Sequence, residues 1–101
     1  MAISAKMDTH QQTLIINIIG RFDFNSHNDF RQSYENLPEP PQRVLINMKQ
    51  ATFIDSSALG MLLILRDLAG GDSANIEIVD CNDEVREILN MANFNNLFSI
   101  K

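Results

Sequence analysis

The chain has 101 residues, of which 45% are hydrophobic and 21% charged, and this is typical of one globular domain with a modest core. Its net charge is −5 and its eight basic residues are scattered, which excludes the basic stripe needed to bind nucleic acid or an anionic membrane surface. Cys81 is the only cysteine, so an internal disulfide is impossible, and its position at the end of a predicted strand indicates a small core residue.

The first residues do not resemble a targeting segment. Residues 1–6 contain no apolar stretch of the kind that a secretory signal needs, and the longest uncharged apolar run is too short to cross a bilayer. We therefore expect a single domain over residues 1–101, with a cytoplasmic location and no membrane partner.

Two strands are predicted at the start of the chain. Residues 3–10 predict a rather polar strand, and Gln11-Gln12 predicts a turn. Residues 13–19 are rich in β-branched side chains and apolar at both alternating positions, which predicts a strand covered on both faces. Gly20 is expected to end it. Because only a turn separates the two strands, we expect this pair to depart from parallel pairing.

A first helix is expected after a loop at residues 21–25. Asn25 and Ser26 are both candidate N-caps, and Ser26 with Asp29 three residues later is an analogue of a capping box. The helix cannot pass Pro38, which opens a proline-rich loop. Its apolar stripe is spaced at i, i+4 and i+7 and consists of Phe30, Tyr34 and Leu37.

A second helix is preceded by a third strand. Residues 43–48 predict the strand, and residues 49–52 lead toward Asp55-Ser56-Ser57 and a long uncharged run. Asp and Ser accept hydrogen bonds from the first amides of a helix, so we expect a helix over about residues 57–69 with Ser56 exposed at its amino end. Gly70-Gly71 supplies its stop.

The last third of the chain predicts a strand, an amphipathic helix and a short edge strand. Residues 75–81 form the strand, Asn82 caps the helix, and residues 97–101 form the edge strand. The apolar face of this helix consists of Val85, Ile88, Leu89 and Ala92. The whole order, ββαβαβα(β), predicts an α/β fold in which helices pack against a mixed, mostly parallel sheet.

Groups able to catalyse a reaction are scarce in this sequence. His10 lies in a predicted turn and His27 near a helix start, and neither context presents an imidazole to a serine. An exposed Asp55 is a weak base without a perturbed pKa. One cysteine and two histidines show no spacing for a metal. We expect neither an enzyme nor a metal or cofactor site.

One hexapeptide is similar to a known signature. Residues 55–60, Asp-Ser-Ser-Ala-Leu-Gly, resemble the signature of the STAS domain, as found in bacterial anti-sigma factor antagonists. Residues 20–23 resemble the family's Gly-x-(Leu/Phe)-Asp after the second strand, and residues 44–48 resemble the strand before the signature. The resemblance covers essentially the whole chain. One departure is that the family usually ends in a further helix, whereas this sequence stops at Lys101.

The resemblance implies a partner-switching protein of the STAS domain fold. In the family, the serine after the aspartate is phosphorylated by a partner kinase that is often also the anti-sigma factor, and Ser56 is the matching position. The unphosphorylated form would bind that regulator, and a metal-dependent serine phosphatase would restore it. By position, the contact surface would comprise Asp23, Phe24, Asn25, Asp55, Ser57, Leu59, Gly60 and Leu63 beside Ser56.

Each of these assignments has a purely structural alternative. Asp-Ser-Ser at a helix start is often only a cap, which contributes about 1 kcal/mol. On a helical wheel, Leu59 and Leu63 fall on the outer side with Gly60, where a neighbouring segment could cover them or a partner could bind them. The side expected to face the sheet consists of Ala58, Met61, Leu62, Leu65, Leu68 and Ala69.

Two other functions stay open. One is a non-switching STAS subunit of a transporter or a signalling scaffold, which the intact Asp55-Ser56 pair disfavours. The other is a small-ligand or nucleotide-binding STAS module, which no glycine-rich loop or basic phosphate clamp supports.

Overall fold

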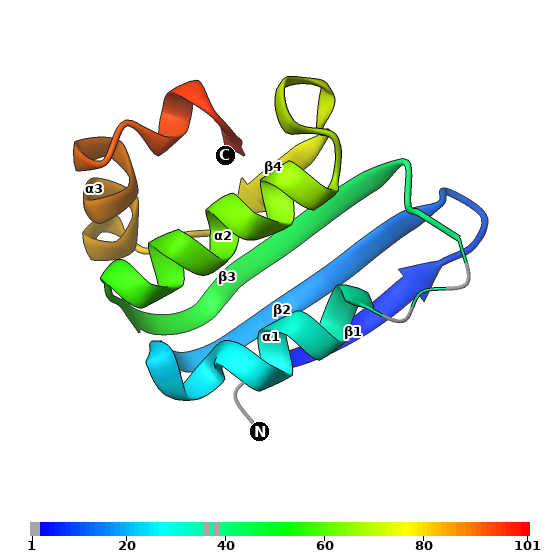
Figure 1. Cartoon of the computed structure of the whole chain (residues 1–101). Helices are drawn as coiled ribbons and strands as arrows, with labels where there is room; N and C mark the ends of the chain where they lie inside the picture. Colours follow the sequence, from blue (N-terminus) through cyan, green and yellow to red (C-terminus); the bar gives the residue numbers. More distant parts are fainter. Residues whose placement is uncertain (1–2, 36, 38) are drawn as a thin grey trace.

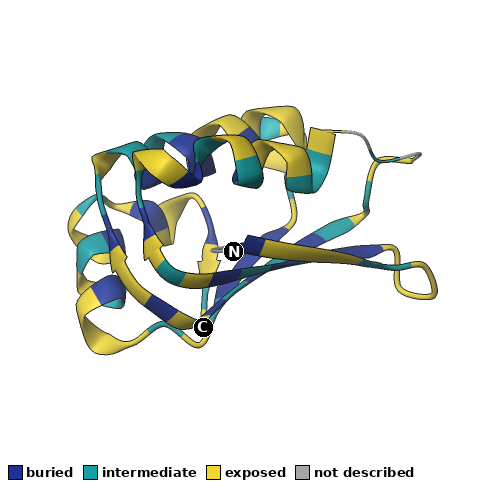
Figure 2. Cartoon of the chain, turned by 90° about the horizontal axis from the view of Figure 1, so that it is seen from below, coloured by how far each residue is buried: buried dark blue, intermediate teal, exposed yellow. Residues whose placement is uncertain are grey.

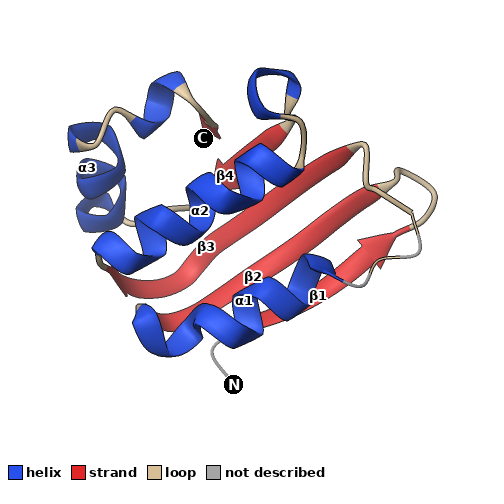
Figure 3. Cartoon of the chain, in the orientation of Figure 1, coloured by secondary structure: helices blue, strands red, loops and turns tan. Residues whose placement is uncertain are grey.

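The computed structural model describes residues 3–35, 37 and 39–101. These residues form one five-stranded sheet with helices packed on it (Figures 1 and 3). The strands are β1 (Ile3–Asp8), β2 (Thr13–Phe22), β3 (Arg43–Ile54), β4 (Ile76–Val79) and β5 (Ser99–Ile100). The helices are α1 (His27–Glu35), α2 (Ser56–Leu68) and α3 (Asp83–Met91), with 3-10 turns at Phe24–Ser26 (η1), Gly71–Ser73 (η2) and Phe94–Asn96 (η3).

The sheet is mixed and mostly parallel, as predicted. Its strand order is β1-β2-β3-β4-β5, in which β1 pairs antiparallel with β2 and each later pair is parallel. The order ββαβαβα(β) is therefore confirmed, together with the departure of the first pair from parallel pairing. None of the helices in the described part of the chain is long and apolar enough to cross a membrane.

The core lies between the helices and one face of the sheet. Alternate residues of the central strands are buried there, and α1 and α2 lie along the same side of the sheet (Figure 2). The buried strand residues are Leu14, Ile16, Ile18, Val44, Ile46, Met48, Ile76 and Ile78. The prediction that residues 13–19 are covered on both faces is wrong: Ile15 is only half-buried and Ile19 is 40% exposed. From β2 to β5, each strand is followed in the sheet by the next strand of the sequence. When such connections between parallel strands are all right-handed, their helices lie on the same face of the sheet.

Both central strands are longer than predicted. Instead of ending at Gly20, β2 continues to Phe22, and Gly20 adopts a φ of +78° where the pairing with β3 shifts register. The strand β3 continues past Met48 to Ile54, because Gln50 and Ala51 stay paired with Ile19 and Gly20 between two register shifts. At the other extreme, β4 is shorter than the predicted 75–81.

A 3-10 turn precedes the first helix, and its capping residues differ from those predicted. Neither Asn25 nor Ser26 is the N-cap. Asp23 caps the 3-10 turn η1, and its capping box pairs Asp23 with Ser26 instead of Ser26 with Asp29. In the apolar stripe Phe30 is buried and Tyr34 is half-buried, whereas Leu37 lies beyond the end of α1. The predicted stop at Pro38 falls outside the described residues.

The other two helices agree with expectation at their starts. Asp55 caps α2, which begins at Ser56, one residue earlier than predicted. Leu68 and Ala69 do not face the core as predicted; both are exposed, and Leu68 is 70% exposed. Asn82 caps α3 as predicted, because its Oδ1 accepts from the Val85 amide at 2.8 Å. The predicted edge strand at the C-terminus is also present as β5.

Candidate functional site

The candidate site lies where β2 and β3 end side by side. Their last register pair is Phe22 with Ile54, so Asp23 and Asp55 are the first residues after two neighbouring parallel strands. The segments that follow, η1 and α2, contact each other. The fold therefore brings the segments that begin at Asp23 and Asp55, 32 residues apart in the sequence, to one end of the molecule (Figure 1).

Asp55 fixes the start of α2. Its backbone is extended, with φ −123° and ψ −175°, and its Oδ1 accepts from the Ala58 amide at 3.0 Å. Ser56 is consequently the first helical residue, and its side chain is exposed. Helix starts present unpaired amides and a partial positive charge, so a negatively charged group at Ser56 is compatible with α2.

Asp23 organises the neighbouring turn in a similar way. Its Oδ1 accepts from the Asn25 amide at 3.0 Å, and the buried Ser26 hydroxyl donates to the Arg21 carbonyl at 3.2 Å. These bonds hold η1 so that Phe24 and Asn25 point to solvent, with Phe24 72% exposed. The Phe24 ring is therefore a large apolar group exposed close to the start of α2.

The outer side of α2 carries small and apolar groups next to Ser56. Gly60 is one turn further on, and a Cβ placed there would meet nothing within 4 Å. Leu63 is 39% exposed, whereas Leu59 is half-buried and packs against the core. Leu59 is therefore largely covered by its own chain, whereas the Leu63 side chain is partly exposed to solvent.

The nine residues singled out from the sequence lie in residues 23–25 and 55–63, the two segments that follow the last β2–β3 pair. We call them the Ser56 surface: Asp23, Phe24, Asn25, Asp55, Ser56, Ser57, Leu59, Gly60 and Leu63. Asp23, Asp55, Ser57, Leu59 and Gly60 are half-buried, and the other four are exposed. The surface thus combines two carboxylates, exposed hydroxyl and amide groups, and two exposed apolar side chains.

Three neighbouring residues were missed by the sequence reasoning. Arg21 lies over the Phe53 ring, with its Cζ 4.2 Å from the ring centroid, and its Nε is 3.4 Å from Asp23 Oδ2. The side chain of Phe53, on β3, is 36% exposed, and that of Ile64, on α2, is 51% exposed. Arg21 stands inside the Gly20–Asp23 motif, but only the β2–β3 register puts it opposite Phe53. For Ile64, the position on the helical wheel, at the flank of the apolar face of α2, could have indicated its exposure.

The two histidines occupy different places in the fold. His10 lies in the turn between β1 and β2, and the His27 ring stacks on Phe24 with 6.4 Å between centroids. Across the described residues, no group of three or more His, Cys, Asp or Glu side chains could hold a metal ion.

Comparison with known protein families and curated proteins gives consistent matches. The family model for the STAS domain matches residues 4–101. A STAS-domain containing protein of Pseudomonas aeruginosa (strain UCBPP-PA14) is 51% identical over 100 residues, which are 99% of each chain. An anti-sigma F factor antagonist of Paenibacillus polymyxa is 24% identical over 94 residues, which are 91% of this chain and 80% of that protein.

Solved structures share the fold at low sequence identity. The anti-sigma factor antagonist SpoIIAA, a Bacillus cell fate determinant, in its phosphorylated form has a TM-score of 0.72 at 17% identity, over 99% of this chain and 91% of that one. An anti-sigma factor antagonist from Mycobacterium paratuberculosis has a TM-score of 0.73 at 14% identity, over 97% and 84%. A sulfate transporter family protein from Wolinella succinogenes has a TM-score of 0.74 at 18% identity, over 84% and 70%.

Proposed function

Since the chain belongs to the STAS domain family, we propose that it is a partner-switching regulatory protein. Its unphosphorylated form binds an anti-sigma factor or an analogous regulator through the Ser56 surface. A serine kinase, which can be that same regulator, transfers the γ-phosphoryl group of ATP to the Ser56 hydroxyl and so releases the complex. A metal-dependent serine phosphatase restores the binding form. All of these partners act in the cytoplasm.

The observation that carries the proposal is the position of the Ser56 hydroxyl. It is exposed on the first residue of α2, and the exposed Leu63 and the uncovered Gly60 lie on the same outer side of the helix. A kinase can reach this hydroxyl without any unfolding, and a partner that covers Gly60 and Leu63 also covers Ser56. Modification and binding thus compete for the same surface.

Electrostatics gives the direction and size of the switch. A phosphoryl group adds about −1.5 to −2 charges at neutral pH. The helix start offsets part of this, by roughly 0.3–2 kcal/mol, so the fold is retained. An interface that closes over an unmatched phosphate beside Asp55 loses about 2–5 kcal/mol, by analogy with unpaired interfacial charges. At about 1.4 kcal/mol per tenfold, the affinity falls by roughly 30-fold to several thousandfold.

The names of relatives support this assignment. A curated relative is an anti-sigma F factor antagonist, and a solved structure with the same fold is such an antagonist in a phosphorylated form. The likeness in fold to a sulfate transporter family protein favours the second candidate function, a non-switching STAS subunit of a transporter or scaffold. The Asp55-Ser56 pair at an exposed helix start favours the switch over that alternative.

The test is capture of partners from cells of the source organism by variants at one position. Ser56→Ala is expected to retain the regulator, and Ser56→Asp is expected to lose it, while both unfold within a few degrees of the parent. Ser73→Asp is the matched control, because Ser73 is also exposed but lies in η2, beyond the far end of α2. If both Ser56 variants recover every partner equally, the switch is rejected, and the second candidate function, a non-switching STAS subunit, remains.

A further inference from the structure

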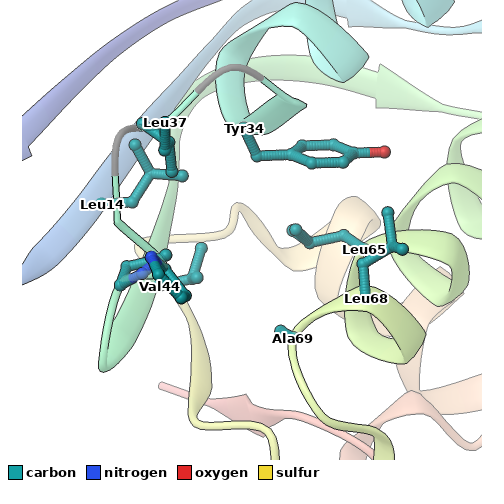
Figure 4. Close-up of a pocket in the computed structure, with 9 residues that line it drawn as sticks. Leu14, Tyr34, Leu37, Val44, Leu65, Leu68 and Ala69 are labelled. Carbon is teal, nitrogen blue, oxygen red and sulfur yellow. The ribbon is translucent and has the colours of Figure 1, made fainter.

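A cavity lies at the opposite end of α2 from Ser56. It has a volume of about 290 Å³ and is surrounded by the C-terminal ends of α1 and α2, the starts of β2 and β3, and Leu37, Pro40 and Pro41 (Figure 4). The lining residues are Leu14, Tyr34, Leu37, Pro40, Pro41, Val44, Leu65, Leu68 and Ala69. Because α2 has 13 residues, the cavity and Ser56 are roughly 18 Å apart along the helix axis.

The floor of the cavity is part of the rigid core, whereas its rim is exposed. Leu14, Val44 and Leu65 are each at most 3% exposed, and Leu68 at the rim is 70% exposed. Leu68 and Ala69 are exposed because the end of α2 borders this open cavity. A preformed apolar floor with an open rim is the usual form of a small-molecule site.

The lining defines the chemistry of a ligand. None of these nine side chains carries a formal charge, which excludes recognition of a phosphate or nucleotide here. Tyr34 supplies the polar group: its ring lies along one side of the cavity, with the hydroxyl toward Leu65 and Leu68 (Figure 4). Burial raises the pKa of Tyr34, so the hydroxyl keeps its proton at neutral pH and can donate one hydrogen bond.

We infer that this cavity binds a small uncharged molecule that is mostly hydrocarbon and carries one hydrogen-bond acceptor for the Tyr34 hydroxyl. In the liquid, one water molecule occupies roughly 30 Å³. If each non-hydrogen atom of a ligand needs a similar volume, the cavity of about 290 Å³ accommodates a ligand of about ten non-hydrogen atoms. Such a ligand covers the exposed methyl groups of Leu68 and displaces water from apolar walls. The site goes beyond the proposed switch and does not depend on it.

The test uses 1-octanol as the probe, because its chain and hydroxyl match the size and polarity of the cavity. In methyl-resolved NMR titrations of the full chain, we expect saturable shifts at Leu14, Val44 and Leu65, with nuclear Overhauser contacts from the probe to these methyl groups. Adenosine monophosphate is expected to shift none of them. Chemical shift changes that grow without saturation, or that fall on other residues, would overturn the inference. The same result is expected if the cavity accepts only a side chain of a partner protein, so that case also counts against a small-molecule site.

Variants locate the site. Ala69→Phe puts a ring into the space that the Ala69 methyl group borders and is expected to weaken octanol binding at least tenfold. Tyr34→Phe, which keeps the ring, is expected to weaken it about three- to tenfold through the lost hydrogen bond. Asn90→Phe on the exposed side of α3 is the matched control and should bind like the parent. If folded Ala69→Phe protein binds octanol as the parent does, the proposed site is contradicted. If that variant does not fold, the nuclear Overhauser contacts between octanol and the methyl groups of the parent protein test the site instead.

Discussion

Asp23 and Asp55 occupy equivalent positions on two neighbouring parallel strands. Each directly follows a member of the last β2–β3 pair, Phe22 and Ile54. The carboxylate of each accepts a hydrogen bond, at 3.0 Å, from a backbone amide in the first turn of the helical segment that follows it. The two carboxylates thus fix both segments that present the Ser56 surface. Their structural role and their proposed role in partner binding can be separated by substitution.

For Asp55, the cap and the charge are tested by two variants. Asp55→Ala removes the acceptor for the Ala58 amide and is expected to lower the free energy of unfolding by about 1 kcal/mol. Asp55→Asn keeps a good capping side chain and should stay within a few tenths of a kcal/mol of the parent. Urea denaturation measures both. If the two variants are equally destabilised, the loss does not come from the cap.

The neighbours Leu62 and Leu63 separate core from surface on α2. Leu62 is fully buried, so Leu62→Ala is expected to cost about 2–5 kcal/mol in stability. Leu63→Ala removes a partly exposed side chain and should change stability by less than about 1 kcal/mol while it weakens capture of the regulator. Chemical denaturation and partner affinity are measured on the same samples. A Leu63→Ala protein that binds like the parent removes Leu63 from the Ser56 surface.

Glu77 is predicted to be the key member of an ion-pair group away from the site. It is 8% exposed on β4 and pairs with Arg43 on β3 and with Lys101, whose Nζ is 2.7 Å from Glu77 Oε1. Glu77→Ala leaves two cations without their carboxylate and is expected to cost about 1–3 kcal/mol. Lys101→Ala removes a mostly exposed partner and should cost about 0–1 kcal/mol. Thermal unfolding of the two variants checks the order, and a larger loss for Lys101→Ala contradicts it.

Alkaline pH is predicted to destabilise the fold partly through Cys81. Burial raises the pKa of this thiol above its ordinary value of 9.0, so the folded state holds the proton longer than the unfolded chain does. The stabilisation is complete below about pH 9 and is lost as the pH rises through the raised value. Urea unfolding between neutral and alkaline pH should show a steeper decline for the parent than for Cys81→Ala. Parallel declines in the two proteins contradict a shifted thiol.

The sequence was sufficient where one local rule decides the structure. The caps at Asp55 and Asn82 and the element order follow from such rules, and so does the exposure of Ser56. The extension of β3 through residues 49–52 depends on register shifts against β2, which alternation of side chains cannot reveal. Leu68 lies at the edge of the apolar arc of α2, and its exposure depends on the space beside the end of α1 at Glu35. The contact of Arg21 with Phe53 likewise depends on strand pairing.

The most direct test compares the affinity of one purified regulator for the unphosphorylated chain and for the chain phosphorylated at Ser56. The regulator is the protein captured by Ser56→Ala, and calorimetry gives both dissociation constants while thermal unfolding monitors the fold. We expect phosphorylation to weaken binding by roughly 30-fold or more with a melting temperature within a few degrees of the parent. Equal affinities for the two forms, with phosphate verified on Ser56 by mass spectrometry, would contradict the proposed switch.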